Sequence, residues 1–172
     1  MKHISLLNPI TIKYLWDNPN TKYFIINLLN QFFNENEEYE LLNYFSDESQ
    51  NVRSYTIFKT KSKVIIMDYN INENESQLND DLDIMNFIKE TTNEKPYLLY
   101  FSNASGGNLN EGNVYIVRKN SDNNSYVKFL LASNFKEQQK FDFNDITNYL
   151  YNLDEYFLKR YLKEKELLYN YK

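Results

Sequence analysis

Apolar positions in the first third of the chain repeat with the period of a helix. Asn8 before Pro9 is typical of a helix start, because Asn caps the free backbone N–H groups and Pro fits the first helical turn. A short helix is therefore expected to run through Trp16. A second helix is predicted for residues 21–33, where apolar side chains recur at i, i+3, i+4 and i+7. These are Ile25, Leu28, Leu29 and Phe32.

The middle of the chain alternates between strand-like and helix-like patterns. Short runs rich in β-branched and aromatic residues predict strands, and a three-residue connection predicts a hairpin between the second and third of them. The strands are expected at residues 39–45, 52–59, 63–71 and 96–101, with a helix at residues 82–91. Acidic residues at the expected start of that helix complement the helix dipole. They are Asp80, Asp81 and Asp83.

The last third is predicted to form a hairpin and a long helix. Strands are expected at residues 114–118 and 126–132, with a turn at residues 122–124. A helix is expected over residues 144–169, because its apolar residues form one stripe. The stripe consists of Ile146, Leu150, Leu153, Phe157 and Tyr161.

These elements predict an α+β fold with a mixed β-sheet. Residues 20–102 follow the order α–β–β–β–α–β, which differs from a regular βαβ alternation. The 172 residues fit one domain, and no linker divides them, so a single domain over residues 1–172 is expected.

Composition narrows the chemistry. The chain has no cysteine and one histidine, so disulfides, thiol nucleophiles, zinc ribbons and multi-histidine metal sites are not expected. The net charge is −5, which argues against a basic footprint over the whole protein but leaves room for a local patch. Frequent Asn, Lys, Tyr and Ile indicate an AT-rich genome. No signal peptide or long apolar segment is seen, so we expect a cytoplasmic protein with no membrane partner.

The opening of the chain resembles a known family. Residues 6–9 (Leu-Leu-Asn-Pro), the turn at residues 18–22 and the helix beginning near Ile25 resemble the recombination-promoting nuclease/putative transposase branch of the PD-(D/E)XK nuclease superfamily. The resemblance covers about residues 5–71. It implies a restriction-endonuclease-like core and an active site on the second and third core strands.

In that family an Asp lies on the second strand, and a Glu and a Lys or Gln lie on the third. The matching positions here are Thr56, Asp68 and Asn70, of which only Asp68 carries a carboxylate. Such nucleases need two or more acidic oxygens for Mg²⁺ and a Lys-like group near the attacking water. The resemblance therefore implies a degenerate site, with Asp68 as a metal ligand only if activity persists and no cofactor otherwise.

Strand alternation predicts that these positions share a surface. If the hairpin centres on Ser62, Thr56 lies opposite Asp68, and Ser54 lies opposite Asn70. This register predicts a polar cluster on one face of the sheet. A row of solvent-facing polar residues explains the same pattern without a site.

A second candidate surface lies near the C-terminus. Lys159, Arg160 and Lys163 are interleaved with tyrosines, a combination that can bind a phosphate backbone. A solvated helix face accounts for the same residues. Near the first predicted strand, Glu37, Glu38 and Glu40 are read as a solvated helix end or, alternatively, as a source of an extra carboxylate.

Three functions are compatible with the sequence. The first is a catalytically degenerate nuclease-fold protein that acts by binding, with a protein partner favoured and nucleic acid possible. The second is a small acidic inhibitor, immunity or anti-defence protein of unrelated fold. The third is an active Mg²⁺-dependent endonuclease, which the substitutions at Thr56 and Asn70 disfavour.

Overall fold

A computed structural model describes residues 4–33, 37–45, 55–69, 75–121 and 124–153, together with Phe157 and Lys159. The chain forms two compact units, which we describe separately. One contains residues 1–34, 44–54 and 124–172, and the other contains residues 35–43 and 55–123. Along the chain, the predicted α–β–β–β–α–β order is confirmed by the elements from α2 to β4.

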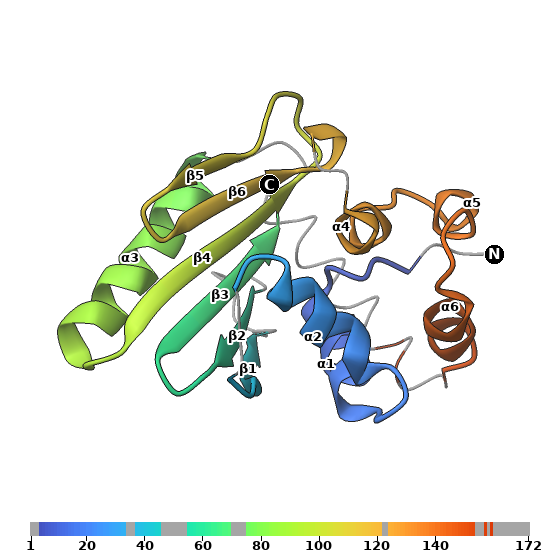
Figure 1. Ribbon diagram of the computed structural model, residues 1–172, viewed down its shortest axis with the longest axis horizontal. Helices are drawn as coiled ribbons and strands as arrows, with labels where there is room; N and C mark the ends of the chain where they lie inside the picture. Colours follow the sequence, from blue (N-terminus) through green and yellow to red (C-terminus); the bar gives the residue numbers. More distant parts are fainter. Residues whose placement is uncertain are drawn as a thin grey trace. The chain divides into compact units, whose positions relative to one another are not determined.

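A mixed six-stranded sheet has the order β1-β2-β3-β4-β6-β5 (Figure 1). Strands β3, β4 and β6 are parallel neighbours, while β2 and β5 pair antiparallel to β3 and β6. The fold is therefore α+β, as predicted. The strands are β1 (Glu40–Phe45), β2 (Tyr55–Lys59), β3 (Lys63–Tyr69), β4 (Lys95–Ser102), β5 (Leu109–Glu111) and β6 (Val114–Arg118).

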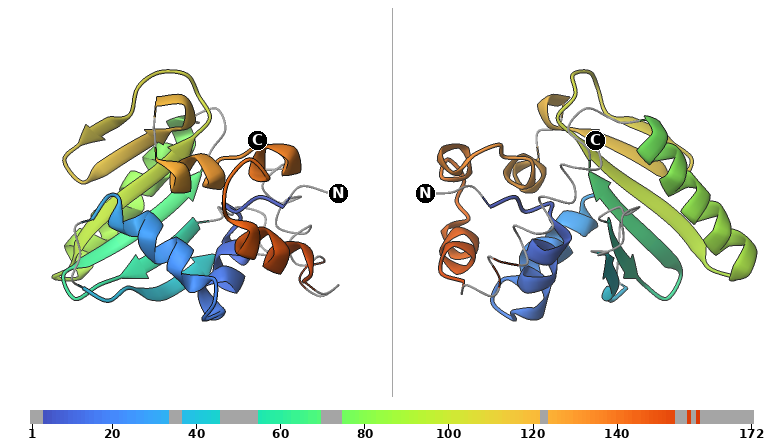
Figure 2. Two further views of the ribbon diagram at one scale, coloured as in Figure 1. Left: turned by 45° about the vertical axis from the view of Figure 1, so that its right-hand side comes forward. Right: turned by 180° about the vertical axis from the view of Figure 1, so that it is seen from behind.

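Helix α3 (Glu75–Thr91) connects β3 to β4 and runs along one face of the sheet (Figure 2). Its Met85 packs with Ile66, Leu98 and Tyr100 in a buried cluster. Helix α3 begins seven residues before the predicted start, because residues 75–81, which lack an apolar stripe, are also helical. The acidic residues at positions 80, 81 and 83 therefore lie inside the helix and not at its first turn, so their assignment to the helix start was wrong.

The other unit contains α1 (Pro9–Asp17) and α2 (Lys22–Asn30), close to their predicted positions. Asn8 caps α1 as expected, since its Oδ1 accepts a hydrogen bond from the Ile10 N–H at 2.9 Å. Phe24 of α2 lies at the centre of an aromatic cluster with ring-centroid distances of 5.2–5.5 Å. Its partners are Tyr126, Phe129 and Phe143.

The predicted C-terminal hairpin is not present. Residues expected to form its second strand form α4 (Ser125–Leu130), which is followed by α5 (Phe135–Gln138). The physical reason lies at Asn124, whose Oδ1 accepts hydrogen bonds from the N–H groups of Tyr126 and Val127. Asn124 is thus a helix N-cap and not a hairpin turn residue.

The predicted continuous helix over residues 144–169 was also wrong. Helix α6 (Asn144–Tyr151) ends at Tyr151, and Asn152 is its C-cap. Asn152 binds the end of its own helix, because its Nδ2 donates to the carbonyl of Asn148 at 2.7 Å. Residues 152 and 153 are not helical, so the apolar stripe is interrupted there.

The N-terminal segment is held by polar contacts within the helical unit. The Ile4 N–H donates to the Tyr151 hydroxyl at 2.9 Å, and the Gln138 side chain donates to the Ile4 carbonyl at 2.9 Å. The Tyr151 hydroxyl in turn donates to Gln138 Oε1 at 2.9 Å. This closed set of three hydrogen bonds fixes the segment before α1 against α5 and α6.

Candidate functional site

Asp68 lies near the end of β3, on the face of the sheet that α3 covers. Only 3% of the residue is exposed. Its Oδ1 accepts a hydrogen bond from the Tyr69 N–H at 2.7 Å, and its Oδ2 accepts one from Gln77 Nε2 at 2.9 Å. Gln77 also donates to the Tyr69 carbonyl at 3.0 Å. The predicted site residue is therefore a buried acceptor that connects β3 to the first turns of α3.

The register of the β2–β3 hairpin differs from the predicted one by one residue. Thr56 lies opposite Met67 and not opposite Asp68. Because side chains alternate along a strand, Thr56 and Asp68 point to opposite faces of the sheet. Ile57, next to Thr56, packs on the α3 side, which places Thr56 on the other face. The predicted polar cluster of Thr56 and Asp68 was therefore wrong, and so was the alternative of a solvent-facing row, since both residues are buried.

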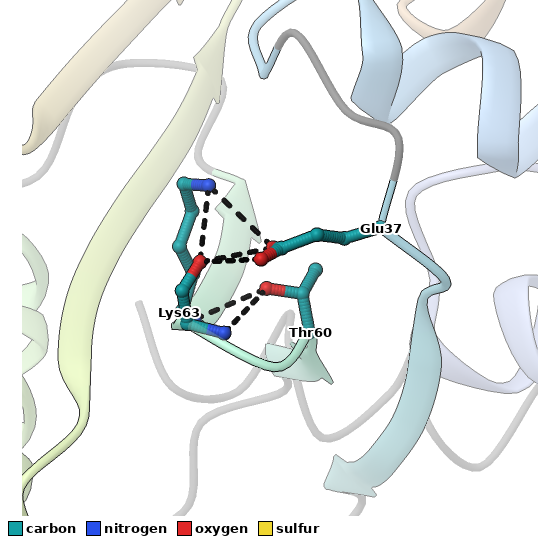
Figure 3. Close-up of polar contacts among 4 residues, drawn as sticks. Glu37, Thr60 and Lys63 are labelled. Carbon is teal, nitrogen blue, oxygen red and sulfur yellow. Dashed lines mark hydrogen bonds and ion pairs between the residues drawn. The ribbon is translucent and has the colours of Figure 1, made fainter.

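The hairpin turn explains the shift in register (Figure 3). The Thr60 N–H donates to the Lys63 carbonyl at 2.9 Å, and the Thr60 hydroxyl accepts from the Lys63 N–H at 3.1 Å. Thr60 and Lys63 therefore close the turn. Its centre falls between Lys61 and Ser62, half a residue before the predicted centre, and this moves every facing pair by one position.

Glu37 stabilises the same turn. Both carboxylate oxygens accept from the Ser62 hydroxyl at 2.9 Å, and Lys63 Nζ lies 3.7 Å from Oε2 (Figure 3). Hydrogen bonding from Thr60 and Ser62 lowers the pKa of the Glu37 carboxyl, and the Lys63 charge adds to this effect. Glu37 thus stabilises the hairpin turn. Its interpretation as part of a solvated helix end did not predict this role.

Two further buried residues, one on β4 and one on α3, were not foreseen from the sequence. Tyr100 of β4 lies directly opposite Asp68 in the parallel register. Asp81 lies one turn after Gln77 on α3 and is fully buried. The spacing of Gln77, Asp81 and Met85 at i, i+4 and i+8 was the available signal, but it becomes visible only when α3 is extended back to Glu75.

The hydrogen bonds that Asp68 accepts limit the chemistry that this carboxylate can perform. Each Asp68 oxygen already accepts an N–H donor from the protein, so the group acts as a structural acceptor. Across the ranges that the structure describes, no group of three or more His, Asp or Glu side chains could hold a metal ion.

The remaining predicted site residues are placed as follows. Ser54, Asn70, Arg160 and Lys163 lie outside the described residues. Lys159 is helical and exposed. Within the described ranges, none of the helices is both long and apolar enough to cross a membrane.

The outward face of α3 carries an unusual combination of side chains. Asp83, Phe87 and Glu90 are all exposed, and their spacing of i, i+4 and i+7 places them on one side of the helix. Phe87 is 66% exposed, more than the other exposed large apolar residues of the described chain. We call these three residues the α3 face.

Comparisons with family models, with curated proteins and with solved structures gave no match to this chain.

Proposed function

We propose that this chain is a catalytically degenerate nuclease-fold protein that acts by binding, and that its partner is a protein and not a nucleic acid. The nuclease-like scaffold is inferred from the resemblance of residues 5–71 to the PD-(D/E)XK superfamily. The observation that carries the loss of catalysis is the bonding of Asp68. Its two oxygens are taken by the Tyr69 N–H and the Gln77 amide.

A metal-dependent role for Asp68 would require breaking these bonds. A buried donor that loses its acceptor costs about 1–3 kcal/mol, so Gln77 and Tyr69 oppose binding of a cation at this carboxylate. Thr56 points to the opposite face of the sheet and supplies no second oxygen ligand there. Both features favour a binding protein over an active endonuclease.

The α3 face supports a protein partner. Exposed aromatic side chains are often the residues that contribute most to protein recognition, and Phe87 is such a residue. Asp83 and Glu90 beside it would repel a nucleic-acid backbone but attract basic groups. We therefore expect the partner to present Lys or Arg side chains around an apolar pocket that accepts Phe87. An acidic inhibitor of unrelated fold would use the same face in the same way.

The test compares capture by the α3 face with capture by a control surface. Phe87→Ala and the double variant Asp83→Lys/Glu90→Lys should each lose a protein that wild type retains from lysate of the native host. Leu109→Ala removes a second exposed apolar side chain, 51% exposed on β5, and should retain that protein. Equal retention by all variants would rule out the α3 face, and loss by Leu109→Ala alone would place the contact on β5.

A further inference from the structure

Helix α3 covers only part of its face of the six-stranded sheet. A helix is about 10 Å wide and neighbouring strands lie about 4.8 Å apart, so one helix covers roughly two strands. The buried cluster under α3 accordingly belongs to β3 and β4, through Ile66, Leu98 and Tyr100. Among the described residues of this unit, α3 is the only α-helix. The next strand on this face, β2, therefore lies beside the helix and not beneath it.

The side of α3 that faces β2 follows from the neighbours of Lys89. A hollow at the C-terminal end of α3 is lined by Lys89 and by Asn113, which directly precedes β6. The Lys89 side of the helix therefore faces β6. Residues two positions apart on a helix point about 200° apart, so Phe87 lies on the opposite side, toward β3 and β2. Ile84 lies on the Phe87 side, because it is three residues away.

Apolar side chains of β2 continue this side of α3. Tyr55 and Ile57 lie on the α3 side of the sheet, where both pack against the buried cluster, as Ile84 does. These three residues are only partly buried, and Phe87 is 66% exposed. We call Tyr55, Ile57, Ile84 and Phe87 the α3–β2 strip. It is an apolar surface that the described residues of this unit leave partly open.

The charges around the strip are mostly negative. Asp80 lies on the strip side of α3, and Asp83 and Glu90 are the exposed acids of the α3 face. On the same side of the sheet, Lys59 of β2 forms an ion pair with Glu94, so its charge is largely neutralised. An element that covers the strip therefore meets a net negative charge and is favoured when it carries basic side chains.

The hydrogen bonding of the sheet decides which kind of element can cover the strip. Strand β2 has a neighbour on each edge, β1 and β3, so a further strand cannot pair with it. A helix satisfies its own main-chain groups and needs only an apolar side to pack on a sheet. A helix that lies parallel to α3 would extend the layer that α3 begins.

We infer that the protein partner places a basic amphipathic helix on the α3–β2 strip. The apolar side of this helix covers Tyr55 and Ile57, and Phe87 fits between its successive turns. Its Lys and Arg side chains reach Asp83 and Glu90. This inference rests on the proposed function and adds to it the structural element that binds, since the proposed function requires contact with the α3 face alone.

Fluorescence anisotropy with three labelled peptides of about 18 residues tests the inference on the full chain. The first contains Leu at i, i+3, i+4 and i+7 and Lys elsewhere, the second has Glu in place of Lys, and the third is the first in scrambled order. The first should bind at least about tenfold more tightly than the third, and the second should not bind. Asp83→Lys/Glu90→Lys should abolish binding. Glu111→Lys/Asp142→Lys changes the net charge equally at exposed positions away from the strip and should bind as wild type does.

Variants of β2 test whether the helix lies over this strand. Ile57→Thr should weaken binding of the first peptide by at least about threefold, because apolar contact is lost. Leu109→Thr makes a similar change on β5 and should have no effect. Lys59→Gln removes a positive charge and releases the Glu94 carboxylate, so the first peptide should bind more tightly, a gain that misfolding cannot imitate.

Four results would overturn the inference. They are equal binding of the first and scrambled peptides, equal loss in the two charge-reversal variants, unchanged affinity in Ile57→Thr, and weaker binding by Lys59→Gln. Failure of the proposed function is seen separately, in the lysate experiment, when wild type and Phe87→Ala retain the same proteins. If Phe87→Ala loses the host protein but Ile57→Thr keeps both this protein and the peptide, the partner binds α3 without a helix over β2.

Discussion

Gln77 on α3 donates a hydrogen bond to Asp68 on β3 over 2.9 Å, in a buried environment. The bond joins a helix to the strand that precedes it, and it uses the one carboxylate that the nuclease resemblance would assign to a metal. Its role can be measured through stability. Asp68→Ala removes the acceptor of the Tyr69 N–H and one of the two acceptors of Gln77 Nε2, so the free energy of unfolding should fall by about 2–4 kcal/mol.

Urea denaturation measures this loss. Asp68→Asn keeps one acceptor oxygen and should lose less stability than Asp68→Ala. Asp83→Ala, at an exposed position of α3, should change stability by no more than about 0.5 kcal/mol. Equal effects of Asp68→Ala and Asp83→Ala would show that the buried hydrogen bonds contribute little.

The second prediction concerns cleavage of DNA by this chain. With Thr56 and Asn70 in place of the groups that the family reaction needs, we expect no Mg²⁺-dependent cleavage of plasmid or single-stranded DNA. Cleavage that disappears in Asp68→Asn would contradict the binding-protein proposal and would imply a relocated carboxylate, with Glu38 and Glu40 as the first residues to test. Cleavage that persists in this variant would indicate a contaminating nuclease.

The C-terminal basic residues give a third prediction. If the chain bound nucleic acid through Lys159, Arg160 and Lys163, its affinity would fall steeply between about 50 and 200 mM salt. We expect only weak binding at either salt concentration, because the net charge of −5 opposes approach to a polyanion. A gel-shift titration decides the matter. Tight binding at low salt that is lost in the triple variant Lys159→Glu/Arg160→Glu/Lys163→Glu would favour a nucleic-acid partner.

The aromatic cluster of the helical unit should be sensitive to truncation. Phe24 is fully buried, with three aromatic rings within 5.5 Å of its own centre. Phe24→Ala should lower the free energy of unfolding by about 3–5 kcal/mol. Phe87→Ala removes the same side chain from an exposed position and should leave stability within about 0.5 kcal/mol of wild type. Similar losses in the two variants would contradict the burial of Phe24.

Stability at high pH gives a fifth prediction. Burial raises the pKa of Tyr69 to about 12 from the ordinary value of 10.0. The unfolded chain therefore loses this proton first, so the contribution of neutral Tyr69 is complete below pH 10 and is lost as the pH rises toward 12. In Tyr69→Phe, the free energy of unfolding should fall less steeply between about pH 10 and 12. Identical slopes in denaturant titrations of the two proteins would refute this.

The periodic parts of the sequence predicted the fold well, and the exceptions have physical causes. Strand β4 was predictable for two reasons. Its apolar run is too short for a helix, and Pro96 comes directly before that run. The run at residues 126–132 is also short and mostly apolar, so periodicity alone could not separate strand from helix. The side chain of Asn124 decides in favour of a helix, through hydrogen bonds that a hairpin turn would not need.

The candidate site was harder to predict than the fold. Asp68 was correctly placed on the third strand, but its neighbours depended on the register of a turn that closes through the Thr60 hydroxyl. A shift of the turn centre by half a residue places Thr56 on the face of the sheet opposite to Asp68. Asp81 was assigned to the start of the helix, where it would complement the helix dipole, because the burial of a carboxylate is not visible without the position of the sheet beneath α3.

The short outer strand β5 has a consequence for the behaviour of the protein at high concentration. It has only three residues, all exposed, and ends with Glu111. A strand of this length offers few free main-chain groups to the sheet of a neighbouring molecule. The charge of Glu111 at its end also opposes pairing with another strand. Leu109 can therefore stay uncovered on this strand without making this edge of the sheet a template for strand pairing.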